Sequence, residues 1–162
     1  AIRADAPQAA ILHLATHMLR EDHGSGTVQR LAFSAPEKPS ITDDGFVGLD
    51  ELFDESWRAK LDRCRLVVLN ACDTQGGELR GSDGVLGMPW GFMFAGASSI
   101  VATQWTVQDA AAAAWARPFY SELTPGKLTP LVEALHRTKK RLRKNSPDPR
   151  DWAAHILVGD GR

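Results

Sequence analysis

The sequence is poor in cysteine and has no long apolar run. Its 162 residues include two cysteines, Cys64 and Cys72. Two thiols are too few for a disulfide framework, and their spacing is not the C-x-x-C of a zinc or redox pair, so we expect both to be reduced. No apolar run approaches the roughly 20 residues that cross a bilayer, and no signal peptide is recognisable. These absences favour a cytoplasmic protein that does not contact a membrane.

Net charge is also nearly absent. The formal charge of −1 creates no overall field that would attract nucleic acid or an acidic surface. The charges are nevertheless uneven: residues 43–55 are rich in Asp and Glu, and residues 137–144 are rich in Lys and Arg. We interpret the basic run as the solvated face of a helix and expect no nucleic-acid partner. A chain of this length, 43% hydrophobic, is sufficient for one domain with its own core.

Apolar segments with the length of strands alternate with segments of helical character. We expect strands at residues 9–17, 65–71, 98–105 and 153–160, because short apolar runs bounded by turn signals are typical of strands buried on both faces. We expect helices at residues 50–61, 85–97 and 129–144, and another that starts at a capping box of Thr106 and Asp109 and is kinked or broken at Pro118. This alternation predicts an α/β fold with a parallel sheet and right-handed crossovers.

Two segments are expected to lack regular structure for most of their length. Residues 20–48 are polar and contain Gly and Pro, so we predict a loop with a short hairpin arm at residues 27–33. The sequence SPDPR, residues 146–150, is predicted to be a linking turn.

Polar or reactive side chains follow three of the predicted strands. His17 ends the first strand, Cys72 follows the second, and Trp105 ends the third. Sites in open α/β sheets lie beyond the carboxyl ends of the strands. An imidazole next to a thiol can take its proton or hold it as a thiolate, and backbone N–H groups can stabilise an oxyanion. The pattern therefore indicates a cysteine enzyme that transfers acyl groups.

Each of these residues also has a purely structural interpretation. Cys72 can be a small buried hydrophobic residue, and Trp105 can be ordinary core. Cys64 precedes its strand, so we interpret it as structural. His13 lies within the first strand and is predicted to pack in the core with its imidazole hydrogen-bonded. We assign no role to the three remaining histidines, His23, His136 and His155.

The glycine-rich segment after the second strand does not match a phosphate-binding loop. Gly76 and Gly81 have the spacing of the two P-loop glycines, but Ser82 follows directly where that motif requires Lys. A G-x-G-x-x-G motif is also absent. We therefore expect neither a nucleotide nor any other organic cofactor, and no metal.

The order of ILHLATH, LVVLNACDTQGG, GVLGMPWGFMFAGASSIVATQWTVQDAA and DWAAHILVGD over residues 9–160 resembles the CHAT family of caspase-like cysteine peptidases, relatives of caspases and separases. The resemblance implies a caspase-haemoglobinase-like three-layer sandwich with a mostly parallel sheet. His17 matches the family's general base and Cys72 its nucleophile. The backbone N–H groups of Met18 and Cys72 would form the oxyanion hole, with Met18 standing where the family usually has Gly. Trp105 would form a wall of the substrate cleft.

The resemblance also implies partners. Members of this fold have two strands and a helix before the His strand, so residues 1–162 are expected to be the C-terminal catalytic part of one domain. An N-terminal segment or a separate chain would complete the sheet, and a helical-repeat region such as a TPR would regulate it. The implied reaction is cleavage of a protein substrate. The alternative is a catalytically silent scaffold or protein-interaction module.

The acidic residues near the predicted site suggest which substrate side chain the site prefers. Asp73 stands beside the proposed nucleophile, and Asp109 follows the third strand. Either carboxylate could pair with a basic P1 side chain. Asp109 is equally well placed to cap the helix that begins there.

Overall fold

The computed structural model describes residues 2–23, 26–40, 43–70, 83–123 and 129–162. The helices in these segments are α1 (Ile2–Asp5), η1 (Ala6–Gln8), α2 (Leu49–Leu52), α3 (Asp83–Phe94), α4 (Asp109–Glu122), α5 (Leu131–Arg143) and α6 (Pro149–Trp152). The strands are β1 (Ile11–Leu14), β2 (His17–His23), β3 (Gly26–Ala32), β4 (Phe46–Gly48), β5 (Leu66–Leu69), β6 (Ser99–Thr103) and β7 (His155–Gly159). None of the helices in these described segments is long and apolar enough to cross a bilayer.

The main sheet has the strand order β1-β5-β6-β7. β1, β5 and β6 are parallel, which confirms the predicted α/β sheet, and Leu14 pairs with Leu69 where β1 and β5 end. The alternation alone implied a fully parallel sheet, but β7 runs antiparallel to β6, so the sheet is mostly parallel, as the resemblance implied. Two long helices, α4 and α5, lie between β6 and β7. They bring the chain back to the carboxyl end of β6, where β7 begins. His155 at the start of β7 is therefore paired with Thr103 at the end of β6.

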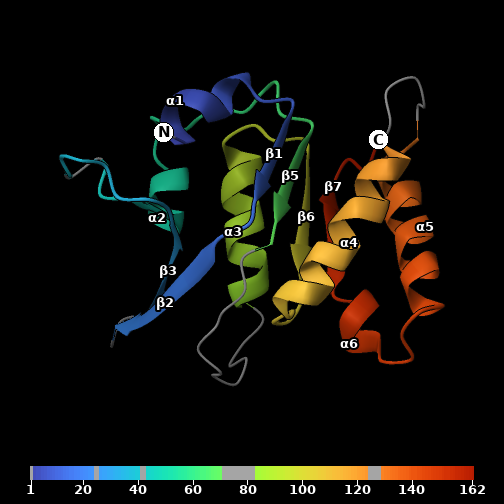
Figure 1. The fold of residues 1–162 in the computed structure, drawn as a ribbon. Helices are drawn as coiled ribbons and strands as arrows, with labels where there is room; N and C mark the ends of the chain where they lie inside the picture. Colours follow the sequence, from blue (N-terminus) through green and yellow to red (C-terminus); the bar gives the residue numbers. More distant parts are fainter. Residues whose placement is uncertain (1, 24–25, 41–42, 71–82, 124–128) are drawn as a thin grey trace.

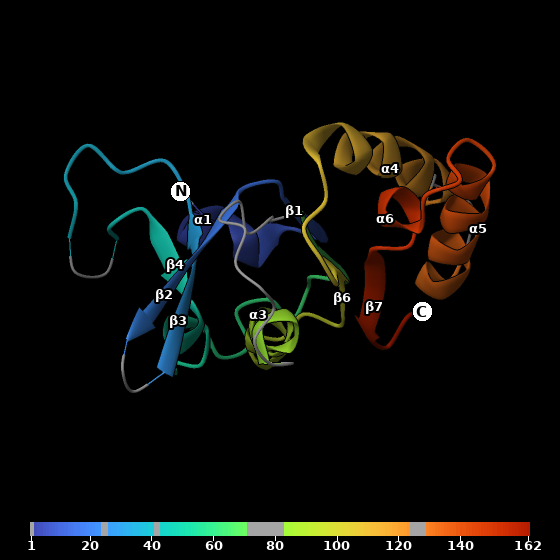
Figure 2. The ribbon, with the colours of Figure 1, turned by 90° about the horizontal axis from the view of Figure 1, so that it is seen from below.

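Helices cover both faces of this sheet and produce three layers (Figure 1). On one face, Val67, Leu69 and Ile100 pack in a core that includes Met88 and Phe92 of α3. On the other face lies a second core of sheet, α4 and α5 residues: Leu66, Val68, Val101, Trp115, Phe119, Leu131, Ala134 and Leu135. Figure 2 shows α3 on one side of the strands and α4, α5 and α6 on the other. All four residues of β5 are buried, as expected for a central strand.

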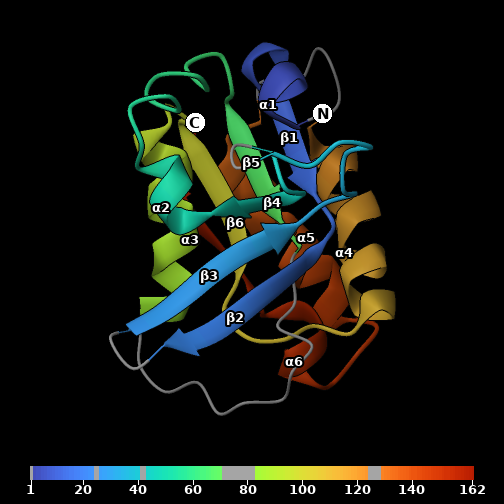
Figure 3. The same ribbon diagram turned by 90° about the vertical axis from the view of Figure 1, so that its left-hand side faces the viewer.

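A second sheet occupies the region that was expected to be a loop. β2, β3 and β4 form an antiparallel sheet in this order, with Met18 opposite Leu31 and Leu31 opposite Val47. Figure 3 shows this sheet in front of the main one. The prediction of a loop over residues 20–48 was wrong except for the hairpin arm. Leu31 and Val47 are fully buried in the α3 core, and this tertiary contact stabilises strands that the polar sequence does not indicate.

Several predicted helix boundaries also change. α2 ends at Leu52 and does not continue to residue 61, because the Asp54 carboxylate accepts a hydrogen bond from the Ser56 N–H and closes a local turn. The predicted capping box was wrong, since the N-cap of α4 is Gln108, whose side chain makes no capping hydrogen bond. Pro118 does not break α4, which is anchored by the buried Trp115 and Phe119 on either side of the proline.

The two segments predicted at residues 129–144 and 146–150 differ less from the structure. The helix predicted at residues 129–144 is confirmed as α5, shorter by two residues at its start and one at its end. The predicted turn at residues 146–150 leads into the single helical turn of α6, which is capped by the Asp148 carboxylate through the Arg150 N–H.

Gly96 terminates α3 in a Schellman motif. Its N–H donates to the Met93 carbonyl (3.0 Å), and the Ala97 N–H donates to the Phe92 carbonyl (3.1 Å). The φ angle of Gly96 is +112°, which side chains rarely adopt. A Cβ at this position would collide with the Asp62 carboxylate and lie 2.9 Å from the Asp62 backbone nitrogen.

We expect Gly96→Ala to lower the free energy of unfolding by about 1–3 kcal/mol, because the backbone must leave a conformation that the Schellman motif requires. Urea denaturation measures the change. Gly87→Ala in the same helix is the matched control, since its Cβ would meet the flexible end of Leu49 at 3.1 Å and the Gln29 side chain at 3.4 Å, and alanine has the higher helix propensity. Equal stability of the two variants would contradict this explanation.

Candidate functional site

The carboxyl ends of β1 and β5 meet at one edge of the main sheet, as predicted. The Asn70 N–H, directly after β5, donates to the carbonyl of Leu14 at the end of β1 (2.9 Å). A cavity of about 380 Å³ opens at this edge. His17 and Asp109 both line it, and Ala112, Ala113 and Ala116 of α4 form one wall. The small side chains of that wall leave room for a ligand.

His17 is placed by the turn that connects the two sheets. It lies three residues beyond the end of β1 and is the first residue of β2, opposite Ala32 of β3. The Thr16 hydroxyl donates a hydrogen bond to the Ala32 carbonyl and so ties the turn to β3. The His17 side chain is exposed at the cavity. An accessible imidazole at this sheet edge can accept a proton from a group that enters the cavity.

The remaining predicted site residues are Met18, Trp105, Cys72 and Asp73. Met18 follows His17 in β2 with a negative φ, and its half-buried side chain packs against the α3 core. Trp105 lies beyond β6 and donates its indole N–H to the Arg150 carbonyl (3.3 Å), and it is not among the described residues that line the cavity. Cys72 and Asp73 lie outside the described residues, so the predicted contact between Cys72 and His17 stays a prediction.

A chain of hydrogen bonds, which we call the Asn70 network, runs beneath the cavity. The Asn70 Nδ2 donates to His13 Nε2 (3.1 Å), and His13 Nδ1 donates to the Tyr120 hydroxyl (2.9 Å). On the other side, His155 Nε2 donates to Asn70 Oδ1 (3.2 Å). The prediction that His13 packs in the core was wrong, since its ring is exposed and lines the cavity, although both its nitrogens are hydrogen-bonded. Its strand is at the edge of the sheet, so no further strand among the described residues covers it.

His155, for which the sequence pattern indicated no role, is fully buried. Its ring stacks on Trp115 with centroids 3.8 Å apart and planes 5° from parallel. Burial, followed by the nearby charges of Lys139 and His13, lowers the pKa of His155 to about 3, so the ring is neutral at physiological pH. Burial also lowers the pKa of His13 and raises that of Tyr120 to about 12. The sequence did contain a signal for His155, because an imidazole within an apolar strand must find a hydrogen-bond partner when it is buried.

Cys64 is structural, as expected. It is fully buried, and its thiol donates to the Leu66 carbonyl (3.3 Å). Burial raises its pKa, which disfavours the reactive thiolate. It also precedes β5, at the opposite edge of the sheet from the cavity.

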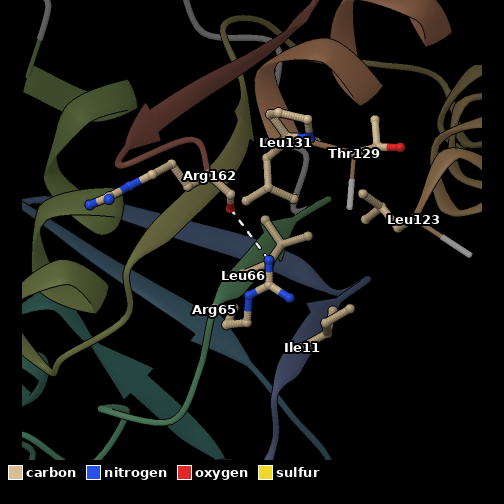
Figure 4. Close-up of a pocket in the computed structure, with 8 residues that line it drawn as sticks. Ile11, Arg65, Leu66, Leu123, Thr129, Leu131 and Arg162 are labelled. Carbon is tan, nitrogen blue, oxygen red and sulfur yellow. Dashed lines mark hydrogen bonds between the residues drawn. The ribbon is translucent and has the colours of Figure 1, made fainter. Parts of the chain in front are cut away.

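A second cavity of about 270 Å³ opens at that opposite edge (Figure 4). Ile11, Leu66, Leu123 and Leu131 line it together with Arg65, whose guanidinium donates to the Arg162 carbonyl at 3.5 Å. This cavity contains no residue predicted for catalysis. The described segments also contain no cluster of His, Cys, Asp and Glu suited to hold a metal ion.

Comparison with known families agrees with the resemblance found in the sequence. A family model described as the CHAT domain matches residues 1–160, nearly the whole chain. No curated protein sequence matches it.

We expect the buried His155 to make the protein sensitive to acid. The unfolded chain binds a proton at the ordinary pKa of 6.5, whereas the folded protein does not until about pH 3. Folding stability contributed by this residue is therefore complete above pH 6.5 and is lost as the pH falls toward 3, by at most about 1.4 kcal/mol per pH unit.

Urea denaturation of the wild type and His155→Phe between pH 7.5 and 4 measures this effect. Phe retains a ring to stack on Trp115 but cannot be protonated. The free energy of unfolding of the variant should therefore fall less steeply with pH. Equal slopes for the two proteins would show that His155 is not the acid-sensitive group.

Proposed function

The chain belongs to the CHAT domain family, a caspase-like family, and we propose that it is a cysteine endopeptidase acting through His17 and Cys72. The position of His17 carries this proposal: it lines a cavity at the sheet edge where β1 and β5 both end. Cys72 follows the end of β5 by three residues in the sequence. The two strands are parallel and both end at this edge, which supports a site in which Cys72 faces His17.

In the proposed reaction, His17 takes the proton of the Cys72 thiol, and the thiolate attacks the carbonyl carbon of the scissile peptide bond. The backbone N–H groups of Met18 and Cys72 stabilise the tetrahedral oxyanion. Collapse of this intermediate breaks the C–N bond, and protonated His17 gives its proton to the leaving amine. His17 then deprotonates a water molecule, which hydrolyses the thioester and regenerates the thiol.

We further propose that the cavity accepts a basic P1 side chain. Asp109 lines the same cavity as His17, and the alanine wall of α4 leaves space for a long side chain. A guanidinium or ammonium group in this cavity would pair with the carboxylate. Asp73 would add a second negative charge beside the nucleophile.

A partner strand for β1 is a separate part of the proposal. Among the described strands β1 pairs with β5 alone, so its other edge carries backbone groups without a strand partner. Ile11 on this strand is 45% exposed. An N-terminal segment or another chain that pairs with this edge would extend the sheet, and a helical-repeat region would regulate the enzyme.

Cys72→Ala and His17→Ala should each lower kcat by at least about 10³-fold, because members of one catalytic unit fail together. Cys64→Ala should retain nearly normal turnover, since that thiol lies at the opposite edge of the sheet. The assay is cleavage of a protein substrate from the same biological system, with mass spectrometry of an electrophilic peptide probe bound at Cys72. Cleavage by well-folded Cys72→Ala would rule out this nucleophile. Specific binding by a wild type that never cleaves would favour a scaffold.

Asp109→Asn should lower kcat/KM for substrates with Arg or Lys at P1 about fivefold, as expected for the loss of one exposed charge pair. Substrates with a neutral P1 residue are the internal control and should be cleaved as before. A panel of fluorogenic peptides measures both, and Asp73→Asn tests the second carboxylate in the same way. An equal loss for basic and neutral peptides would contradict the charge pairing.

A further inference from the structure

The proposed reaction does not use the Asn70 network, although the network lies directly beside the site. Its central amide is held by two imidazoles from different elements, His13 of β1 and His155 of β7. Both histidines contact Asn70, although they lie 57 and 85 positions from it in sequence. The amide is therefore fixed by tertiary contacts on both of its ends.

The two histidines that bind the Asn70 amide are themselves fixed by further contacts. His155 is fully buried and stacked on Trp115, which is also fully buried. His13 is held at its other nitrogen by the Tyr120 hydroxyl, and Trp115 and Tyr120 both belong to α4. The network thus joins β1, β5 and β7 to one helix.

The hydrogen-bond pattern also specifies where the protons lie. Nδ2 of Asn70 donates to His13, so His13 carries its proton on Nδ1 and donates it to Tyr120. Oδ1 of Asn70 accepts from His155, so His155 carries its proton on Nε2. Each imidazole is neutral in this arrangement. The amide has a donor at one end and an acceptor at the other, and each end faces the partner that it requires.

Asn70 is the first residue after β5, and its own N–H is bound to the Leu14 carbonyl. Cys72 follows two positions later in the sequence. We propose that Asn70 is a positioning residue, which His13 and His155 hold so that the chain leaves β5 in the direction that presents Cys72 to His17. This inference rests on the proposed function, because it assigns the network a role in placing that nucleophile.

Three variants test the proposal. Asn70→Ala removes the amide, and His155→Phe removes the buried donor while keeping a ring against Trp115. The double variant combines both changes. Ser99→Ala is the control for lost stability, because Ser99 is buried and accepts a hydrogen bond from the Gly161 N–H but takes no part in the network. Peptide cleavage is measured at a temperature at which urea denaturation shows every variant to be folded.

We expect Asn70→Ala to lower kcat about tenfold or more with KM changed less than twofold, because the amide acts through the placement of Cys72. His155→Phe should lower kcat in the same direction, and the double variant should be no worse than Asn70→Ala, because both changes act through one amide. Ser99→Ala should keep the wild-type kcat. A folded Asn70→Ala with kcat within twofold of the wild type would overturn the proposal, as would additive losses in the double variant.

A second measurement does not depend on peptide cleavage. The rate of Cys72 alkylation by iodoacetamide is followed by mass spectrometry as a function of pH, which also separates Cys72 from the buried Cys64. Misplacement of Cys72 should shift this profile in Asn70→Ala toward the ordinary thiol pKa of about 8.5. If Asn70→Ala does not fold, the same profile is measured on His155→Phe.

The two measurements distinguish failure of the inference from failure of the proposed function. A wild type that cleaves no substrate rejects the peptidase proposal, and the alkylation profile then decides the positioning role by itself. Identical profiles for the wild type and the folded variant would overturn that role, and a shifted profile would support it.

Discussion

Burial of β5 on both faces is the constraint on which the rest of the structure depends. Its alternating side chains are divided between the two cores: Val67 and Leu69 face α3, and Leu66 and Val68 face α4 and α5. A strand buried in this way must have neighbours on both sides, because its backbone groups cannot reach water. β1 and β6 supply these hydrogen bonds in parallel register. The same parallel pairing brings the carboxyl ends of β1 and β5 to one edge, where the cavity lies.

Polar groups at this edge are placed by the apolar layers around them. His155 would be costly in an apolar core, but its stacking on Trp115 and its hydrogen bond to Asn70 make a neutral imidazole acceptable there. His13, on the edge strand, completes the arrangement from the exposed side. The packing that stabilises α4 against the sheet therefore also determines the orientation of the amide that follows β5.

The sequence predicted the parts of the fold that have strong local signals. The apolar runs of β5 and β6 and the amphipathic pattern of α5 can be recognised in the sequence, because burial and periodicity each impose a distinct residue choice. His17 was expected to end the first strand, but β1 ends at Leu14 and His17 is the first residue of β2. β2 and β4 were missed, because these segments become strands only when they pair with β3, whose Leu31 enters the α3 core. His155 was missed because its partner, Asn70, is 85 positions away in sequence.

The sequence by itself determined the order of the main-sheet strands and the longer helices, the family and the residues that follow each main-sheet strand, since each of these depends on local pattern or motif. The tertiary structure alone decided that β7 is antiparallel, that His13 faces the cavity and that Asn70 lies between two imidazoles. These features depend on which distant segments pack together, and packing is a property of shape and burial that no local pattern records. The Asn70 network exists because the two helices after β6 return the chain to the carboxyl end of that strand, so that His155 lies beside the end of β5.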